Sequence, residues 1–344
     1  MVIEYIRKVN FRKAGVGGLL NLGLNYFESK TKPIRCLSNP TTVMSEPTGN
    51  CNLKCKMCVR SAINYKKQGD IDFSKWISVM DNEFPFWHFH GFIGIGEPLF
   101  HKDFAKMIEY LDNRGIWKFV TTNGLLLTDS MIDALITHNL NRMFISVDGA
   151  TKKTYEMIRN CAKFETLVSN VENLVNEVKR RKSKMEIILQ SVFLKENAHE
   201  VPEMVKLAHK LGVKEYRFQD IELKFDTGWS TAEHSLRANR EYFEKHIKEA
   251  LKVGKELGVD VKLYNTTEPS KIRKCCIAPW NQVYIRWDGK ITPCCTTLID
   301  KTFFYGNIFE EHFNDLWNNK KALTFRKMAI SKNQPKQCIN CSCL

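Results

Sequence analysis

The chain has 344 residues and a formal net charge of +14, with 43% apolar and 26% charged residues. This composition is typical of a soluble globular protein with a sizeable core, and no apolar run approaches the roughly 20 residues of a membrane span. The N-terminus has no apolar signal core, so we expect a cytoplasmic protein. Its twelve cysteines gather towards both ends of the chain, and in the cytosol such groups indicate metal ligands rather than disulfides.

The positive charge is compatible with nucleic acid, an anionic membrane surface or an anionic substrate. We interpret its densest run, residues 179–184, as a solvated turn, so nucleic acid is not an expected partner. Residues 1–41 form an N-terminal extension that mixes apolar and basic residues and contains Gly15, Gly17 and Gly18. This predicts short amphipathic helices broken at the glycines, which could lie on a membrane, hold a partner or pack on the main domain. We favour packing.

From residue 42 to about residue 262 the pattern alternates between strands and helices. Repeated βα units predict a parallel sheet with helices on its outer face, and six units are too few to close an eight-fold barrel. Residues 222–239 are a polar connection and a candidate lid. The expected strands are 42–46, 89–95, 118–121, 142–147, 186–193, 215–219 and 261–264, and the expected helices are 104–113, 129–138, 153–159, 164–179, 198–211 and 240–257.

Cys51, Cys55 and Cys58 form a C-x3-C-x2-C pattern just after the first expected strand. Three closely spaced thiolates suit a 4Fe-4S cluster, which then keeps one iron open for a small chelating molecule. Zinc is the alternative, but a closed structural zinc site needs four ligands, and no further His or Cys stands close enough in sequence. The pattern therefore predicts an iron–sulfur site.

The trio resembles the signature of the radical S-adenosylmethionine (SAM) superfamily, although the residue before the third cysteine, often aromatic there, is Met57. The resemblance implies an α/β fold, an open six-unit (β/α)6 partial TIM barrel over residues 42–270. It also implies that the open iron chelates SAM. Reductive cleavage then gives a 5′-deoxyadenosyl radical that abstracts a substrate hydrogen, while the protein supplies binding and orientation.

Two motifs at strand ends resemble SAM-binding motifs of the family. Gly94-Ile95-Gly96-Glu97-Pro98 resembles GGEP, which implies that Gly96 and Glu97 receive the SAM amino group; glycine allows close approach, and a carboxylate suits an ammonium. Thr122-Asn123-Gly124 resembles TNG and places Asn123 near SAM. A plain turn is the alternative for each.

A third motif joins Ser146 to Arg159, thirteen residues later. It resembles the family's pattern for the SAM carboxylate, in which a hydroxyl and a guanidinium bind the anion, and the planar fork of arginine suits a carboxylate. Asp148 is a weaker candidate because Asp-Gly can simply begin a helix. Gln190 on the fifth strand is a further candidate for the same pocket.

The pattern changes near residue 270. Asp288-Gly289 predicts a hairpin between 283–287 and 290–294, and helices are expected at 310–318 and 323–330. Residues 271–344 resemble a SPASM domain in its shortened form, twitch, a small β-hairpin and helical region with one auxiliary 4Fe-4S cluster that acts as an electron conduit or a structural staple. A four-cysteine zinc site is the alternative. The implied ligands are Cys276, Cys294, Cys338 and Cys341, with Cys275, Cys295 or Cys343 as replacements for a neighbour.

The single auxiliary cluster favours a dehydrogenase-type oxidoreductase acting on a small molecule such as a sugar or aminocyclitol, with a flavodoxin or ferredoxin as electron donor. A peptide maturase, an epimerase or a lipid-modifying enzyme is an alternative, and residues 1–41 are short for a peptide-recognition wing. A non-catalytic iron–sulfur electron carrier is the rival from another class, but it has no need of Ser146 and Arg159. Cys161 could give a hydrogen atom to a substrate radical, although a small buried hydrophobe is the simpler interpretation.

Overall fold

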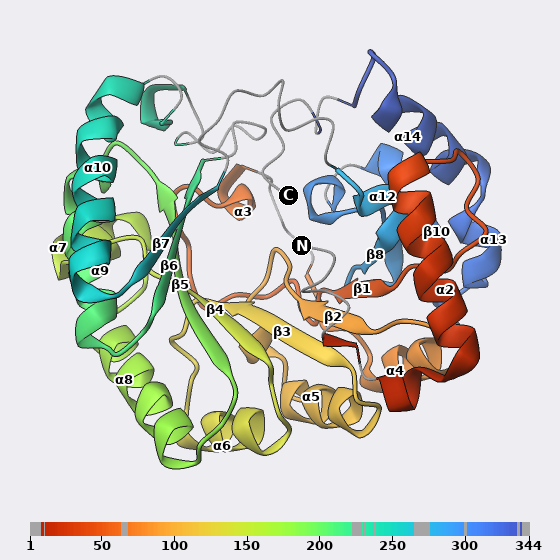
Figure 1. Cartoon of the computed structure of the whole chain (residues 1–344), viewed down its shortest axis with the longest axis horizontal. Coiled ribbons are helices and arrows are strands. Elements are labelled where there is room, and N and C mark those ends of the chain that lie inside the picture. The colour runs from red at the N-terminus through yellow and green to blue at the C-terminus, as the bar shows by residue number, and fades with distance from the viewer. Residues whose placement is uncertain are drawn as a thin grey trace. The chain divides into compact units, whose positions relative to one another are not determined.

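A computed structural model of the chain describes residues 8–9, 11–62, 68–221, 229, 232–236, 239–264, 276–298, 301–335 and 338. The chain forms two compact units (Figure 1). Unit 1 comprises Met1–Asn50, Gln68–Val120 and Arg273–Leu344, and unit 2 comprises Cys51–Lys67 and Thr121–Ile272. The expected segments 1–41, 42–270 and 271–344 are stretches of sequence, and as domains they stay a proposal.

The sheet of unit 1 joins both ends of the chain. The central strand β1 (Thr42–Ser45) pairs in parallel with β2 on one side and with β8 on the other, so that Met44 lies opposite both Gly91 and Tyr284. The C-terminal hairpin thus continues the sheet that the first strand begins. The order is β10 (Gly306–Asn307), β9 (Lys290–Thr292), β8 (Gln282–Ile285), β1, β2 (Phe89–Phe92) and β3 (Trp117–Thr122), with β8, β9 and β10 antiparallel and the last two residues of β3 in unit 2.

The hairpin between β8 and β9 turns at Gly289, as the sequence predicts. Its φ of +81° is in the left-handed region, and a Cβ there would collide with Asn307 and Phe309. Arg286 N donates to Lys290 O at 2.9 Å, which closes the turn. Glycine is therefore required at this turn for both conformation and space.

Helices of unit 1 flank this sheet. A helix between β1 and β2 was not expected: α4 (Phe73–Asn82) begins at Asp72, whose side chain caps Lys75 N, and it buries Trp76 completely. Trp76 Nε1 donates to Ser45 Oγ at 3.0 Å, so α4 is fixed on β1. The other helices are α2 (Phe11–Thr31), η1 (Pro98–Phe100), α5 (Phe104–Asn113), α12 (Ala278–Asn281), η4 (Cys295–Thr297), η5 (Lys301–Phe303), α13 (Phe313–Trp317) and α14 (Lys320–Ile330).

The N-terminal extension agrees with its prediction at one of the three glycines. Among the described residues, α2 consists of two helical stretches joined by a kink at Gly15 (φ 62°), as expected, whereas Gly17 and Gly18 lie within the second stretch. Asn25 attaches it to the C-terminal region, because its Nδ2 donates to Trp280 O at 2.8 Å. Helix α2 thus packs on the body of the protein, which is the interpretation favoured above. The attachment is made by a polar side chain.

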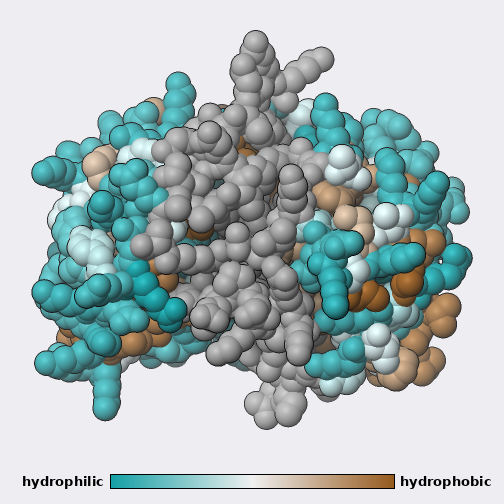
Figure 2. Space-filling view, turned by 90° about the horizontal axis from the view of Figure 1, so that it is seen from above, coloured by the Kyte–Doolittle hydropathy of each residue, from teal (hydrophilic) through white to brown (hydrophobic). Residues whose placement is uncertain are grey.

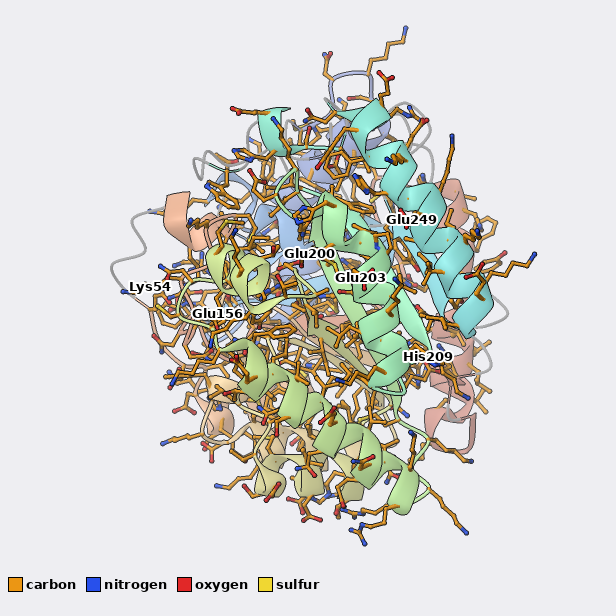
Figure 3. All side chains as sticks on the ribbon, turned by 90° about the vertical axis from the view of Figure 1, so that its left-hand side faces the viewer. Lys54, Glu156, Glu200, Glu203, His209 and Glu249 are labelled. Atoms are coloured by element: carbon orange, nitrogen blue, oxygen red, sulfur yellow. The ribbon has the colours of Figure 1, made fainter. Side chains whose placement is uncertain are left out.

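Unit 2 contains a parallel sheet of its own. Register pairs such as Ser146 with Gln190 and Gln190 with Arg217 fix its alignment. Figure 3 views the helical side of this unit, where α8, α9 and α10 face the viewer. The strands run in the order β4 (Arg142–Ser146), β5 (Glu186–Phe193), β6 (Glu215–Asp220) and β7 (Asp260–Tyr264); the helices are α3 (Val59–Ala62), α6 (Asp129–Thr137), α7 (Lys152–Ile158), α8 (Phe164–Arg180), η2 (Ala198–Glu200), α9 (Val201–Lys210), η3 (Ala232–His234) and α10 (Arg240–Leu257).

The predicted α/β class is confirmed. In unit 1 the strands β1, β2 and β3 are parallel, and in unit 2 the strands β4 to β7 are parallel. Helices separate successive strands along the chain, and a small hairpin and helical region follows. The bounds of α5, β5 and α10 agree with the prediction, and the other predicted strands differ by up to three residues at an end. Among the residues that the structure describes, no helix is both long and apolar enough to cross a membrane.

Glu46 is a buried carboxyl group directly after β1. It has no exposed surface, and its Oε1 accepts a hydrogen bond from Ile95 N at 2.7 Å. Burial raises the pKa of Glu46 to about 7, although the Ile95 hydrogen bond and the nearby Arg286 act to lower it. The end of β1 is therefore joined to the loop after β2 by an acid that titrates near neutrality.

A Glu46→Gln variant tests this burial. Because the pKa in the folded state lies above the ordinary value of 4.5, the contribution of Glu46 to stability is fully present below about pH 4.5 and is lost as the pH rises through about 7. The stability of Glu46→Gln relative to the natural protein should therefore rise over this interval, by roughly 3 kcal/mol. Anaerobic calorimetry at several pH values measures it, with Glu109→Gln, an exposed residue on α5, as control. A difference that stays constant with pH would contradict the burial.

Candidate iron–sulfur and cofactor site

The three-cysteine loop lies in unit 2 and is held by its backbone. Lys54 N donates to Asn160 O, and Lys56 N donates to Ile158 O, both at 3.0 Å. Figure 3 labels Lys54 in this loop and Glu156 on α7, and shows the loop beside the end of α7. The loop is thereby fixed to the segment that carries Arg159.

The thiols of the loop are partly buried and hydrogen-bonded. Leu53 N lies 3.4 Å from Cys51 Sγ and donates to it. Burial raises the pKa of Cys55 to about 12 against the opposing effect of Arg159, and burial also raises the pKa of Cys58. Such thiols lose their protons when they bind a metal, because the ligand is the thiolate.

The donor set of the trio suits a 4Fe-4S cluster, in which each thiolate binds a different iron. Met57 packs against an apolar group that includes Ile158 and Leu194, so the side chain between Cys55 and Cys58 anchors the loop in the core.

A buried ion pair stands beside this loop. Arg159 Nε donates to Asp148 Oδ2 at 2.6 Å, and Arg159 Nη1 lies 4.0 Å from Cys55 Sγ. Asp148 is completely buried, and its Oδ1 also accepts a hydrogen bond from Val192 N at 2.8 Å. Burial alone would lower the pKa of Arg159, but Asp148 raises it above its ordinary value. The guanidinium of Arg159 therefore stays charged next to the cysteines. Asp148, the weaker candidate of the sequence analysis, holds it there.

The other candidates in unit 2 form two smaller contacts. Gln190 Nε2 donates to Ser146 Oγ at 3.3 Å, since the two residues are neighbours in register on β5 and β4. Asn123 Nδ2 donates to Asn52 Oδ1 at 2.8 Å, which joins the turn after β3 to the cysteine loop. The sequence analysis did not identify Asn52 as a site residue. The only signal in the sequence is its position between Cys51 and Cys55.

Glu200 was also missed, and it organises the turn between β4 and α7. Its carboxylate accepts hydrogen bonds from Ala150 N at 2.7 Å and from the hydroxyls of Thr151 and Thr154, each at 2.6 Å. Burial acts to raise its pKa, but these hydrogen bonds lower the pKa below its ordinary value. Figure 3 shows Glu200 among the helices of this unit. It thus fixes the start of the helix that ends at Arg159.

Gly96 and Glu97 lie in unit 1. A Cβ at Gly96 would come within 2.6 Å of Asn50 O, and Glu97 N donates to that same oxygen at 2.8 Å. Glu97 Oε1 accepts a hydrogen bond from Leu99 N at 3.2 Å and so caps η1. The motif therefore packs closely against the residue that precedes Cys51, and only a glycine fits at position 96.

The C-terminal cysteines are described in part. Cys294 is buried at the end of the hairpin, with its Sγ 3.7 Å from Thr297 Oγ1, and Cys276, Cys295 and Cys338 are half-buried. Cys275, Cys341 and Cys343 lie outside the described residues, so the ligand set stays a prediction. Cys161 is exposed, with φ +72°; its interpretation as a buried hydrophobe is wrong.

Two sequence-family models match the chain. The model of the radical SAM superfamily matches residues 45–208, and that of SPASM, an iron-sulfur cluster-binding domain, matches residues 275–342. Together they contain the cysteine trio, all the candidate SAM contacts and the C-terminal cysteines except Cys343.

Curated relatives match most of the chain. A tungsten-containing aldehyde ferredoxin oxidoreductase cofactor-modifying protein of Pyrococcus furiosus is 27% identical, over 86% of this chain and 86% of that protein. A PqqA peptide cyclase of Gluconobacter oxydans is 23% identical, over 82% and 77%. Among solved structures, SuiB of Streptococcus suis bound to its precursor peptide SuiA is similar with a TM-score of 0.65 and 18% identity, over 89% of this chain and 70% of that chain.

The cofactors follow from these matches. They are SAM, the 4Fe-4S cluster that binds it, and auxiliary iron–sulfur clusters in the C-terminal region. The chain belongs to the radical SAM superfamily and carries a C-terminal SPASM iron–sulfur cluster-binding domain.

Proposed function

We propose that this radical SAM enzyme modifies a peptide, with the cluster held by Cys51, Cys55 and Cys58. When bound, the cluster supplies an electron to SAM and thereby generates a radical that abstracts hydrogen. The chain's own part is to fix the three thiols and to keep Arg159 charged beside Cys55. In this proposal Arg159 and Ser146 bind the SAM carboxylate.

The remaining SAM contacts are proposed from their positions. Gln190 donates a hydrogen bond to Ser146, and Asn123 donates one to Asn52 of the cysteine loop, so both lie beside other residues of the proposed SAM site. Glu97 and Gly96 supply a carboxylate and close backbone approach for the amino group. In the C-terminal region we propose Cys276, Cys294, Cys338 and Cys341 as auxiliary ligands.

The proposal of a peptide substrate rests on the similarity of this chain to proteins that act on or bind peptides. The PqqA peptide cyclase spans most of this chain, and SuiB has the same fold and was solved with its precursor peptide. The net charge of +14 supports an acidic peptide, because opposite charge raises the rate of encounter. The sugar or aminocyclitol oxidation expected from the sequence has less support from these relatives and becomes the second candidate. An electron carrier would have no use for the buried Arg159.

A deuterium-transfer assay separates the two candidates. The anaerobically reconstituted enzyme is reduced and incubated with SAM and either deuterated acidic peptides or deuterated aminocyclitols. Deuterium in 5′-deoxyadenosine together with a mass change of the peptide is the expected result, and the Cys51→Ala/Cys55→Ala/Cys58→Ala variant should show neither. Transfer from the aminocyclitol alone would contradict the peptide assignment.

Arg159→Ala tests the carboxylate site. It should weaken SAM binding by roughly 1.5–3 kcal/mol, the scale of a hydrogen bond to a charged group, as measured by titrating SAM into the reduced cluster and following its EPR signal. Because the change leaves Asp148 buried without its arginine, Arg159→Ala/Asp148→Asn is measured alongside it. Arg180→Ala, on the exposed part of α8, is the matched control. Unchanged affinity in the folded double variant would remove Arg159 from the site.

A further inference from the structure

Helix α2 exposes its apolar side chains. After the kink at Gly15, Val16, Leu20 and Phe27 are 76%, 69% and 61% exposed. Their spacing of four and seven residues places them on one face of the helix. The same face is widened by Leu19, Leu24 and Tyr26, all more than one-third exposed.

The opposite face of α2 is polar and buried. Asn21, Asn25, Glu28 and Ser29 are each 8% exposed or less. Asn39 N donates to Asn21 Oδ1 at 2.8 Å, and Asn25 Nδ2 donates to Trp280 O at 2.8 Å. A surface helix of a globular protein ordinarily has the reverse arrangement, with apolar residues towards the core.

The orientation of α2 is fixed by these polar contacts. Glu28 accepts hydrogen bonds from Leu37 N at 2.7 Å and from Ser38 N at 3.1 Å. Turning the helix to bury Leu20 and Phe27 would break these bonds and leave a buried carboxylate and buried amides unpaired, at a high cost. The apolar face is therefore a stable surface feature, and a contiguous surface of this kind indicates a binding partner.

The charges around this face identify the partner. Between residues 13 and 37 the basic residues are Lys13, Lys30, Lys32 and Arg35, and the single acidic residue is the buried Glu28. Lys13, Lys30 and Arg35 are exposed, and Lys30 Nζ lies over the ring of Tyr26 at 5.6 Å. A second copy of the same face would bring like charges together. A partner with an apolar interior and an anionic surface satisfies both features.

We propose that α2 is an interfacial helix that binds unit 1 to an anionic lipid surface. The apolar face enters the boundary between headgroups and acyl chains, while Lys30 and Arg35 contact lipid phosphates. Figure 1 labels α2 along its length, and Figure 2 shows hydrophobic patches among the hydrophilic residues of the surface. Leu37, 79% exposed, extends the apolar surface beyond the helix.

Vesicle co-sedimentation of the holoenzyme tests the proposal. The protein should pellet with phosphatidylcholine vesicles that contain phosphatidylglycerol, and more weakly with phosphatidylcholine alone or at high salt. Leu20→Glu/Phe27→Glu should lower the partition coefficient by about tenfold or more, because both the apolar burial and the charge match are lost. Leu251→Glu, an equally apolar residue 42% exposed on α10, should bind as the natural protein does.

Two further measurements keep the result decisive. Iron content and thermal melting show whether the double variant is folded; if it is not, Lys30→Gln/Arg35→Gln replaces it and should lower binding to anionic vesicles about tenfold. Light scattering after gel filtration tests whether a second copy of this chain covers the apolar face instead. Loss of a dimer in Leu20→Glu/Phe27→Glu, or vesicle binding equal to that of the natural protein in folded variants, would overturn the lipid assignment.

Discussion

The candidate site depends on the buried pair of Arg159 and Asp148. Asp148 follows the end of β4 by two residues, has no exposed surface and accepts hydrogen bonds from both the guanidinium and Val192 N. Arg159 in turn stands in the segment whose carbonyls, at Ile158 and Asn160, hold the cysteine loop. Removing one partner of a buried pair costs about 3–5 kcal/mol, because the other charge is left without compensation. One interaction thus places a permanent cation beside Cys55 and supports the loop that carries the three thiols.

Much of the fold could be predicted from sequence because its strands and helices are short and regular in pattern. The bounds of β5 and α10 were predicted to the residue, and the hairpin was predicted from Asp288-Gly289. Helix α4 was missed although Asp72 is a readable N-cap, since the prediction followed the motifs on either side of it. The orientation of α2 could not be predicted, because periodicity shows a stripe but not which side faces the protein. Its inward side is set by acceptors such as Trp280 O, more than 250 residues away.

The candidate site divides in the same way. Cysteine spacing and the Ser146–Arg159 pattern are local, so they could be read directly. Asp148, Glu46 and Glu200 acquire their importance from burial, which depends on segments distant in sequence. Within unit 1 the N-terminal extension and the C-terminal region are joined, since Cys36 and Asn318 exchange two hydrogen bonds, of 3.0 and 2.8 Å. A surface that binds α2 would therefore hold the same unit that contains Cys276 and Cys294.

The central claim is that two groups of cysteines hold two separate clusters. Iron and sulfide analysis with Mössbauer spectroscopy of the anaerobically reconstituted protein tests it most directly. The account predicts about eight irons in two 4Fe-4S clusters, falling to about four when Cys51, Cys55 and Cys58 are replaced and to about four when Cys276 and Cys294 are replaced. Zinc in place of iron, or a full complement of iron in either variant, would contradict it.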